Sequence, residues 1–92
     1  MRAVYDTVYI EFVARLRTAR KAKGFTQGDL AGLLHKPQSY VSKIETCERR
    51  IDVIEAARWC VVLGITLGDV LPAHLTVADN RGTNKRVSKT KR

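Results

Sequence analysis

The sequence predicts a small all-α fold of five short helices, followed by a basic C-terminal tail. Apolar residues recur at the helical period along the chain, and the alternation typical of strands is nearly absent. Capping residues and glycines stand where the helical segments begin and end. The chain has 92 residues, of which 45% are apolar, so it can form one core and one domain.

The first helix is predicted at residues 7–23. Asp6 or Thr7 can cap its start, while Lys21 and Gly24 suit its end, because a cation offsets the helix dipole and glycine accepts a positive φ. Its apolar residues recur three or four positions apart and so share one face: Val4, Val8, Phe12, Val13, Leu16 and Ala19.

The second and third helices are separated by a short turn at residues 35–36. Thr26 and Asp29 have the spacing of a capping box and open the second helix, whose buried side we expect to be Leu30, Ala31, Leu33 and Leu34. Pro37 fits a first helical turn, where no amide donor is needed, so the third helix is predicted at 37–46. Val41 and Ile44 should face inward, with Tyr40 partly inward beside them.

The fourth helix is predicted at residues 53–63, between the capping box of Asp52 with Glu55 and the terminating Gly64. Its inward residues are expected to be Val53 or Ile54, Ala57, Cys60 or Val61, and Leu63. Trp59 lies on this helix, where packing in the core or in a dimer is favoured. Thr66 with Asp69 caps a short fifth helix that carries Leu67, Val70 and Leu71 and ends at Pro72.

The positive charge is concentrated at the C-terminus. The chain carries 17 basic and 9 acidic residues, a net charge of +8, and residues 76–92 hold six of the basic residues and one acidic residue. Residues 78–92 contain too little apolar surface to offset their ordering entropy. We therefore expect a folded domain at 1–77 and a disordered tail at 78–92.

Several functional classes are disfavoured. No run of 18 apolar residues suggests a membrane span, and no apolar stretch after Met1 suggests a secretory signal, so a cytoplasmic protein is expected. Cys47 and Cys60 are expected to act as small apolar residues that fill space in the core. Their spacing relative to each other and to His35 and His74 matches no zinc site. The acidic residues stand at helix starts, where capping explains them. We expect no catalytic residues, metal or cofactor.

Residues 27–44 carry the functional signal. Two short helices joined by so short a turn must cross steeply, with Ala31 at their closest approach. This crossing leaves the outer face of the third helix uncovered. An α-helix fits the DNA major groove, where glutamine, serine and lysine side chains read base edges and phosphates. The side chains expected on this face are Gln38, Ser39, Ser42 and Lys43, with Lys36 at its head.

From Phe12 to Leu71 the sequence resembles the Cro/cI-like phage repressor family of helix-turn-helix proteins, also called the XRE family. The matching segments are LRTARKAKGFTQGDLAGLL, KPQSYVSKIE, the ERRID loop and the closing LGITLGDVL. The resemblance implies a lambda-repressor-like five-helix bundle that binds operator DNA as a homodimer. Repression by covering a promoter is the family's usual mode, and activation also occurs in it.

The resemblance also implies roles for single residues. Gln27 would touch a backbone phosphate and support Gln38, which would pair with an adenine edge. Ser39 and Lys43 would take the other base-facing positions. Further contacts to the DNA backbone are expected from Lys36, Ser42, Arg49 and Arg50. For the two arginines, solvent exposure or pairing with Glu48 and Asp52 is the alternative.

Two positions depart from the family pattern. His35 in the turn of the motif and Cys47 in the loop after the third helix stand where the family often has glycine. If either position needs a positive φ, the side chain there costs about 1 kcal/mol.

The expected dimer surface is the fifth helix with its flanks, because an apolar cluster at the end of a small bundle has too little chain to cover it. Its residues are Leu67, Val70, Leu71 and Leu75, with Val77 as a possible addition. Two other functions stay open. One is an antitoxin-like module that neutralises a protein partner and binds DNA secondarily, and the other is non-specific nucleic-acid coating.

Overall fold

The computed structural model describes residues 7–75. In chain order it contains α1 (Thr7–Ala22), α2 (Gln27–Leu34), α3 (Gln38–Glu45), α4 (Val53–Leu63), α5 (Leu67–Val70) and a 3-10 turn, η1 (Ala73–Leu75). Every element within this range is helical, which confirms the predicted all-α fold and its five helices. The turn η1 was not predicted. The predictions for Val4, Val77 and the tail at 78–92 lie outside the described residues.

The helix starts follow the capping residues in the sequence. The Thr26 hydroxyl accepts a hydrogen bond from the Asp29 amide at 3.0 Å, and the Asp29 carboxylate accepts one from the Thr26 amide at 2.9 Å. The same reciprocal pair opens α4 and α5. Each pair satisfies two amide groups that have no partner inside the helix. Pro37 stands just before α3 with an extended backbone, so α3 begins one residue later than predicted.

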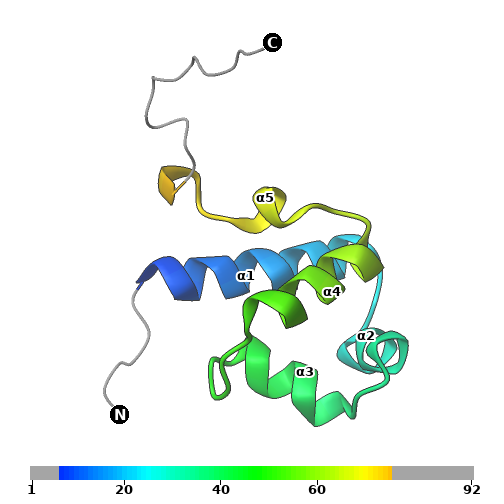
Figure 1. Cartoon of the computed structure of the whole chain (residues 1–92). Coiled ribbons are helices and arrows are strands. Elements are labelled where there is room, and N and C mark those ends of the chain that lie inside the picture. The colour runs from blue at the N-terminus through cyan, green and yellow to red at the C-terminus, as the bar shows by residue number, and fades with distance from the viewer. Residues whose placement is uncertain (1–6, 76–92) are drawn as a thin grey trace.

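The helices enclose one core. In Figure 1, α1 and α4 cross the middle of the molecule, α2 and α3 lie below them and α5 lies above. Trp59 is fully buried, which confirms that it packs in the core, and its indole N–H donates to the Tyr40 hydroxyl at 3.3 Å. Around it pack Leu16, Leu30, Ala31, Val41, Ile44, Ala56, Cys60, Leu63 and Val70.

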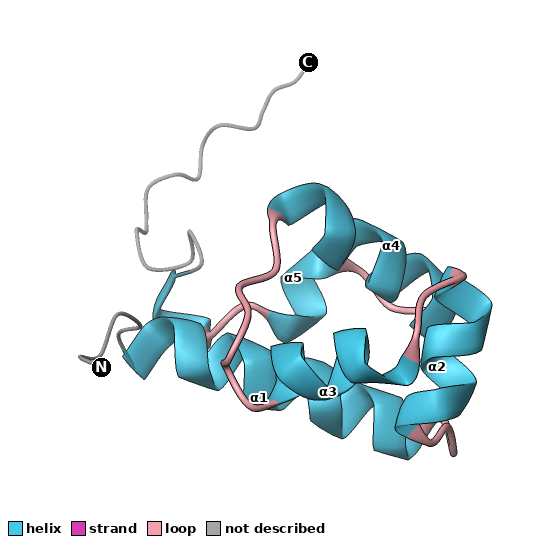
Figure 2. Ribbon diagram, turned by 90° about the horizontal axis from the view of Figure 1, so that it is seen from below, coloured by secondary structure: helices cyan, strands magenta, loops and turns pink. Residues whose placement is uncertain are grey.

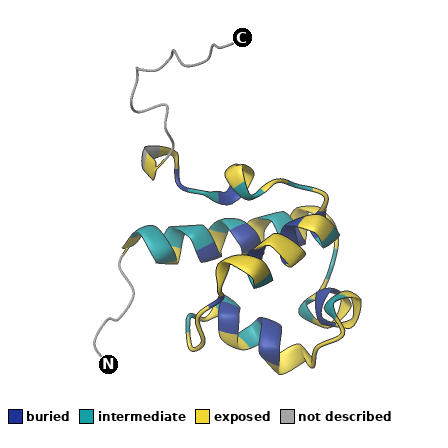
Figure 3. Ribbon diagram, in the orientation of Figure 1, coloured by how far each residue is buried: buried dark blue, intermediate teal, exposed yellow. Residues whose placement is uncertain are grey.

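The inward face of α4 differs from the prediction. Cys60 and Leu63 are buried as predicted, together with Ala56 and Trp59. The predicted Ala57 is exposed, and Val53, Ile54 and Val61 are more than half exposed. The sequence of α4 carries two apolar stripes at helical spacing, and only one can face the core. The stripe that contains Trp59 faces inward because the indole buries more apolar area than any aliphatic side chain on the other stripe. Figure 3 shows the resulting exposed outer side of α4.

Leu33 is a second exception, since it was expected in the core and is 52% exposed. The helix α2 has only eight residues and packs chiefly against α3 and α4. Leu30 and Ala31 fill that side, with Leu34 partly buried, while Leu33 points outward.

Candidate nucleic-acid interface

The turn between α2 and α3 is tight. His35 adopts a left-handed conformation, with φ 59° and ψ 44°, and ends α2. The Lys36 amide then donates to the Ala31 carbonyl at 2.9 Å, which closes the helix end before α3 begins. Ala31 is buried at 2% exposure on α2, the helix that crosses α3, so a larger side chain would have no room there. Figure 2 looks onto this helix-turn-helix from the side of α3.

The two residues that stand where the family often has glycine, His35 and Cys47, both have a strained backbone conformation. His35 has φ 59° and Cys47 has φ 63°, the two non-glycine residues with positive φ in the described chain. Each conformation costs about 1 kcal/mol for a residue with a Cβ atom. The strain is tolerated because neighbouring hydrogen bonds fix the loops. The Cys47 amide donates to the Ile44 carbonyl at 3.0 Å, and the Glu48 amide donates to the Lys43 carbonyl at 2.8 Å.

The helix α3 has one buried and one exposed face. Tyr40, Val41 and Ile44 are buried against the rest of the bundle. Gln38, Ser39 and Lys43 are exposed together on the outer side, and Ser42 beside them is half-buried. The predicted base-facing side chains therefore lie on one uncovered helical surface.

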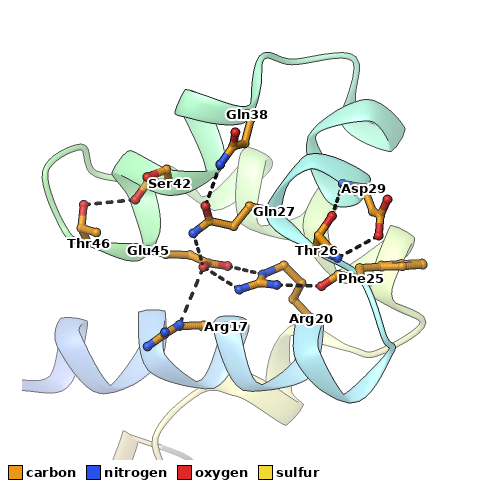
Figure 4. Close-up of polar contacts among 10 residues, drawn as sticks. All are labelled: Arg17, Arg20, Phe25, Thr26, Gln27, Asp29, Gln38, Ser42, Glu45 and Thr46. Carbon is orange, nitrogen blue, oxygen red and sulfur yellow. Dashed lines mark hydrogen bonds and ion pairs between the residues drawn. The ribbon is translucent and has the colours of Figure 1, made fainter.

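A chain of polar contacts runs from the interior to this surface (Figure 4). Arg20 of α1 is buried and donates to both carboxylate oxygens of Glu45, from Nε at 2.7 Å and from Nη2 at 3.0 Å. Its Nη1 donates to the Phe25 carbonyl at 2.7 Å. Gln27 Nε2 donates to Glu45 at 3.0 Å, and Gln38 Nε2 donates to Gln27 Oε1 at 3.0 Å.

These contacts fix the orientation of both glutamine amides. A flipped Gln27 would turn its oxygen toward the Glu45 carboxylate, where two acceptors would repel each other. Gln27 must therefore present its oxygen to Gln38, and Gln38 must donate to it. Gln38 is exposed, and its bond to Gln27 uses one N–H, so its Oε1 and its second N–H can serve a partner outside the protein. One acceptor and one donor side by side match the donor and acceptor edge of adenine.

Arg20 and Glu45 were missed at the sequence level. Their signal is a charged residue placed on an apolar stripe, since Arg20 follows Val13 and Leu16 and Glu45 follows Val41 at helical spacing. A charge at such a position must find a buried partner. One such residue on each of two neighbouring helices, with opposite signs, indicates an ion pair.

Three cationic side chains beside α3 lie over aromatic rings: Lys36, Arg49 and Arg50. Arg49 Nη2 lies 3.1 Å from Glu55 Oε2, and the Arg49 guanidinium carbon is 5.0 Å from the Tyr40 ring centroid. Lys36 Nζ lies 5.3 Å from the same centroid, and the Arg50 guanidinium carbon lies 4.4 Å from the Tyr9 centroid. The carboxylate that pairs with Arg49 is thus Glu55, and neither Glu48 nor Asp52.

The ion pair shifts the titration of its members. The hydrogen bonds that Arg49 donates to the Glu55 carboxylate raise the pKa of the Arg49 guanidinium. Burial raises the pKa of Glu55, but the hydrogen bonds from Arg49 and from the Asp52 amide outweigh it and leave the pKa below its usual value. Burial raises the pKa of the Tyr40 hydroxyl, which donates to Glu55 at 3.4 Å. The loop after α3 is thereby tied to the start of α4.

The predicted dimer residues divide between the core and the surface. Val70 is 2% exposed and packs in the core, so it cannot contribute to a partner surface and that part of the prediction is corrected. Leu67 and Leu71 are half-buried, and Leu75 is 52% exposed. Together with Phe12 of α1 and Val53 of α4, they line an open apolar groove of about 300 Å³.

The side chains and helices of the described residues can also be compared with the requirements of a metal site and of a membrane span. Within residues 7–75, no three His, Cys, Asp or Glu side chains converge as a metal site requires. Cys47 and Cys60 are free thiols whose pKa values are raised by burial. None of the helices in this range has the length and apolar character needed to cross a membrane.

Comparisons with known proteins agree with this geometry. A helix-turn-helix family model matches residues 16–70. No curated protein matches the sequence. Among solved structures, an XRE-family like protein from Pseudomonas syringae pv. tomato is 42% identical, with TM-score 0.66, over 70% of this chain and 78% of the other.

Two further structures show how widely the fold is used. The restriction-modification controller protein C.AhdI from Aeromonas hydrophila is 29% identical, with TM-score 0.66, over 72% of this chain and all of the other. Fe(II)-HppE with its alternative substrate is 25% identical, with TM-score 0.65, over 74% of this chain but only 35% of HppE. The iron and the substrate are therefore properties of that larger protein. With the family model covering more than half of its length, the chain belongs to the XRE family of helix-turn-helix DNA-binding transcription regulators.

Proposed function

We propose that this protein is a sequence-specific repressor that binds a two-fold symmetric operator as a homodimer, with α3 in the major groove. The observation that carries the proposal is the uncovered face of α3, on which Gln38 is held in one orientation by Gln27, Glu45 and Arg20. A side chain fixed before binding loses little entropy on contact with a base.

The base-facing residues are Gln38, Ser39 and Lys43. The fixed amide of Gln38 suits adenine, and the ammonium of Lys43 suits the two acceptors of guanine. Both side chains are exposed on α3, where the protein backbone does not limit their approach to a base edge.

Contacts to the DNA backbone come from residues around this face. Gln27 keeps one N–H available beyond its bond to Glu45, and Lys36 and Ser42 flank the base-facing residues. We propose that both loop arginines, Arg49 and Arg50, contact phosphates, and Arg50 would approach the DNA backbone from its position on the Tyr9 ring. Arg49 is engaged by Glu55 and must leave that carboxylate to reach a phosphate.

Dimerisation follows from the small size of the reading surface. One short helix contacts too few bases for tight discrimination, and two-fold symmetry doubles the contacts. We propose that Leu67, Leu71 and Leu75 pack against their counterparts in a second copy, since they line an open apolar groove next to α4. Recognition helices must then enter successive major grooves, about 34 Å apart. Repression would result from covering a promoter.

The test is selection of bound duplexes from a random DNA library at about 150 mM salt, where non-specific attraction is weakened. The proposal expects an enriched motif with two-fold symmetry and half-sites one helical turn apart. Salt-sensitive binding without an enriched motif would contradict it. Sedimentation at tens of micromolar, with and without the selected duplex, tests the dimer separately. A monomer under both conditions would rule the homodimer out.

A further inference from the structure

A second apolar groove lies between α2 and α4, apart from the residues assigned to DNA and to the dimer. It has a volume of about 510 Å³. Leu33 of α2 and Ile54 and Val61 of α4 line it, with exposed fractions of 52%, 57% and 79%. Helices of a small bundle ordinarily place polar residues on such an outer face, and contiguous exposed apolar side chains mark an interaction surface.

The groove has the spacing of a helix-binding site. Ile54, Ala57 and Val61 lie three and four positions apart on α4 and form a stripe on the side away from Trp59. Leu33 and Leu34 form the opposite wall. A third helix laid between two such walls would insert its own apolar side chains at matching intervals.

The charge in the groove is positive and uncompensated. Arg58 lines it and is exposed, and none of the lining residues is acidic. The neighbouring acids of α4 are engaged elsewhere, because Asp52 and Glu55 form the capping box and Glu55 also binds Arg49. A ligand for this groove therefore gains from a carboxylate beside its apolar face.

The C-terminal residues and a second copy of this chain are poor ligands for the groove. Residues 76–92 carry six basic residues and one acidic residue, so Arg58 would repel them. A symmetric contact between two grooves would cover both Arg58 side chains, and neither groove supplies an acidic residue to pair with them.

We propose that the α2–α4 groove binds an acidic amphipathic helix of a different protein, with an Asp or Glu of that helix on Arg58. Its occupation leaves the exposed face of α3 open, because the groove is built by α2 and the outer side of α4. The inference stands apart from operator recognition. It gives a structural basis to the protein-partner function that the sequence left open.

The test uses a phage-displayed library of helical peptides, selected against the full chain without DNA. Enriched peptides should carry apolar residues at i, i+3 or i+4 and i+7, with Asp or Glu at the edge of that stripe. The strongest peptide is then labelled with fluorescein and titrated by anisotropy. Arg58→Glu should weaken its binding about ten-fold or more, and Val61→Asp should remove saturable binding.

Ile10→Asp is the matched control, because Ile10 is 49% exposed on α1 and lines neither groove. It should bind the peptide like the parent chain, and all three variants should melt cooperatively. Absence of enrichment, basic peptides among those selected, or equal binding to Val61→Asp would overturn the proposal. A loss of self-association on Val61→Asp in sedimentation would also overturn it, because the groove would then be an interface between copies.

Discussion

Removing the Glu45 charge is expected to cost much of the stability of the fold. The base preference of Gln38 should persist as long as residue 45 still offers an oxygen to Gln27. Glu45→Gln leaves the shape of the side chain almost unchanged but deprives Arg20 of its counter-charge. Both side chains are buried, at 7% and 2% exposure for Arg20 and Glu45. Breaking a buried pair by removing one partner costs about 3–5 kcal/mol. A domain of this size has only roughly 3–10 kcal/mol of stability in total, so Glu45→Gln should be close to unfolding.

Replacing both charges should restore the fold. Arg20→Met together with Glu45→Gln removes the unpaired guanidinium. It leaves the Phe25 carbonyl without its donor and the introduced amide N–H2 without the partner that the carboxylate had in Arg20. We expect this double variant to lie within about 2 kcal/mol of the parent chain. The introduced glutamine still offers an oxygen to Gln27, so Gln38 should keep its orientation and its base preference.

A second double variant separates the reading of DNA from stability. Arg20→Met together with Glu45→Leu also removes both charges but leaves Gln27 without an acceptor. The fold should persist, while discrimination at the base pair read by Gln38 should fall by about 1–3 kcal/mol.

Urea unfolding gives the stabilities of these variants, and anisotropy titrations on the selected operator and on single-base-pair changes give their discrimination. Two results would refute the reasoning: a cost below about 1 kcal/mol for Glu45→Gln, which is far from a broken buried pair, or unaltered discrimination in the Glu45→Leu double variant.

Four further results are expected. Lys43→Ala should cost roughly 1–3 kcal/mol and relax preference at one base pair of each half-site, measured by competition between duplexes. Arg50→Ala should weaken all sequences alike and lower the slope of log affinity against log salt by about one unit. His35→Gly and Cys47→Gly should each raise the melting temperature by several degrees, because about 1 kcal/mol of strain is relieved. The pKa of Glu55 is lower in the folded state, so its stabilising contribution is present above the unfolded pKa of about 4.3 and is lost as pH falls through the folded value. Glu55→Gln should therefore destabilise the chain at pH 7, and this effect should shrink progressively as pH falls below the unfolded pKa, as measured by urea unfolding.

The elements of the fold were predictable because their signals are local. The capping boxes at Thr26, Asp52 and Thr66 each depend on two residues three positions apart, and the structure contains all three. The exposed face of α3 was likewise predictable from the spacing of Val41 and Ile44. The possibility of strain at His35 and Cys47 followed from the missing glycines, and both positions have positive φ.

The features that the sequence did not predict depend on contacts between segments that are distant in the chain. Which apolar stripe of α4 faces inward is decided by the space available for Trp59 among the other helices, and the period alone cannot tell. Val70 was assigned to a partner surface because a five-residue pattern does not show that the bundle itself covers it. The pairing of Arg20 with Glu45 joins residues 25 positions apart. The partner of Arg49 was missed for a similar reason, since the loop folds it onto Glu55.

The most direct test of sequence reading by α3 is a duplex selection run in parallel with the parent chain and with Gln38→Ala. The account predicts a two-fold symmetric motif for the parent chain. For Gln38→Ala it predicts the same motif with preference relaxed at one base pair in each half-site. Identical motifs from the two proteins would contradict the placement of Gln38 at a base, and motifs without symmetry would contradict recognition by a homodimer.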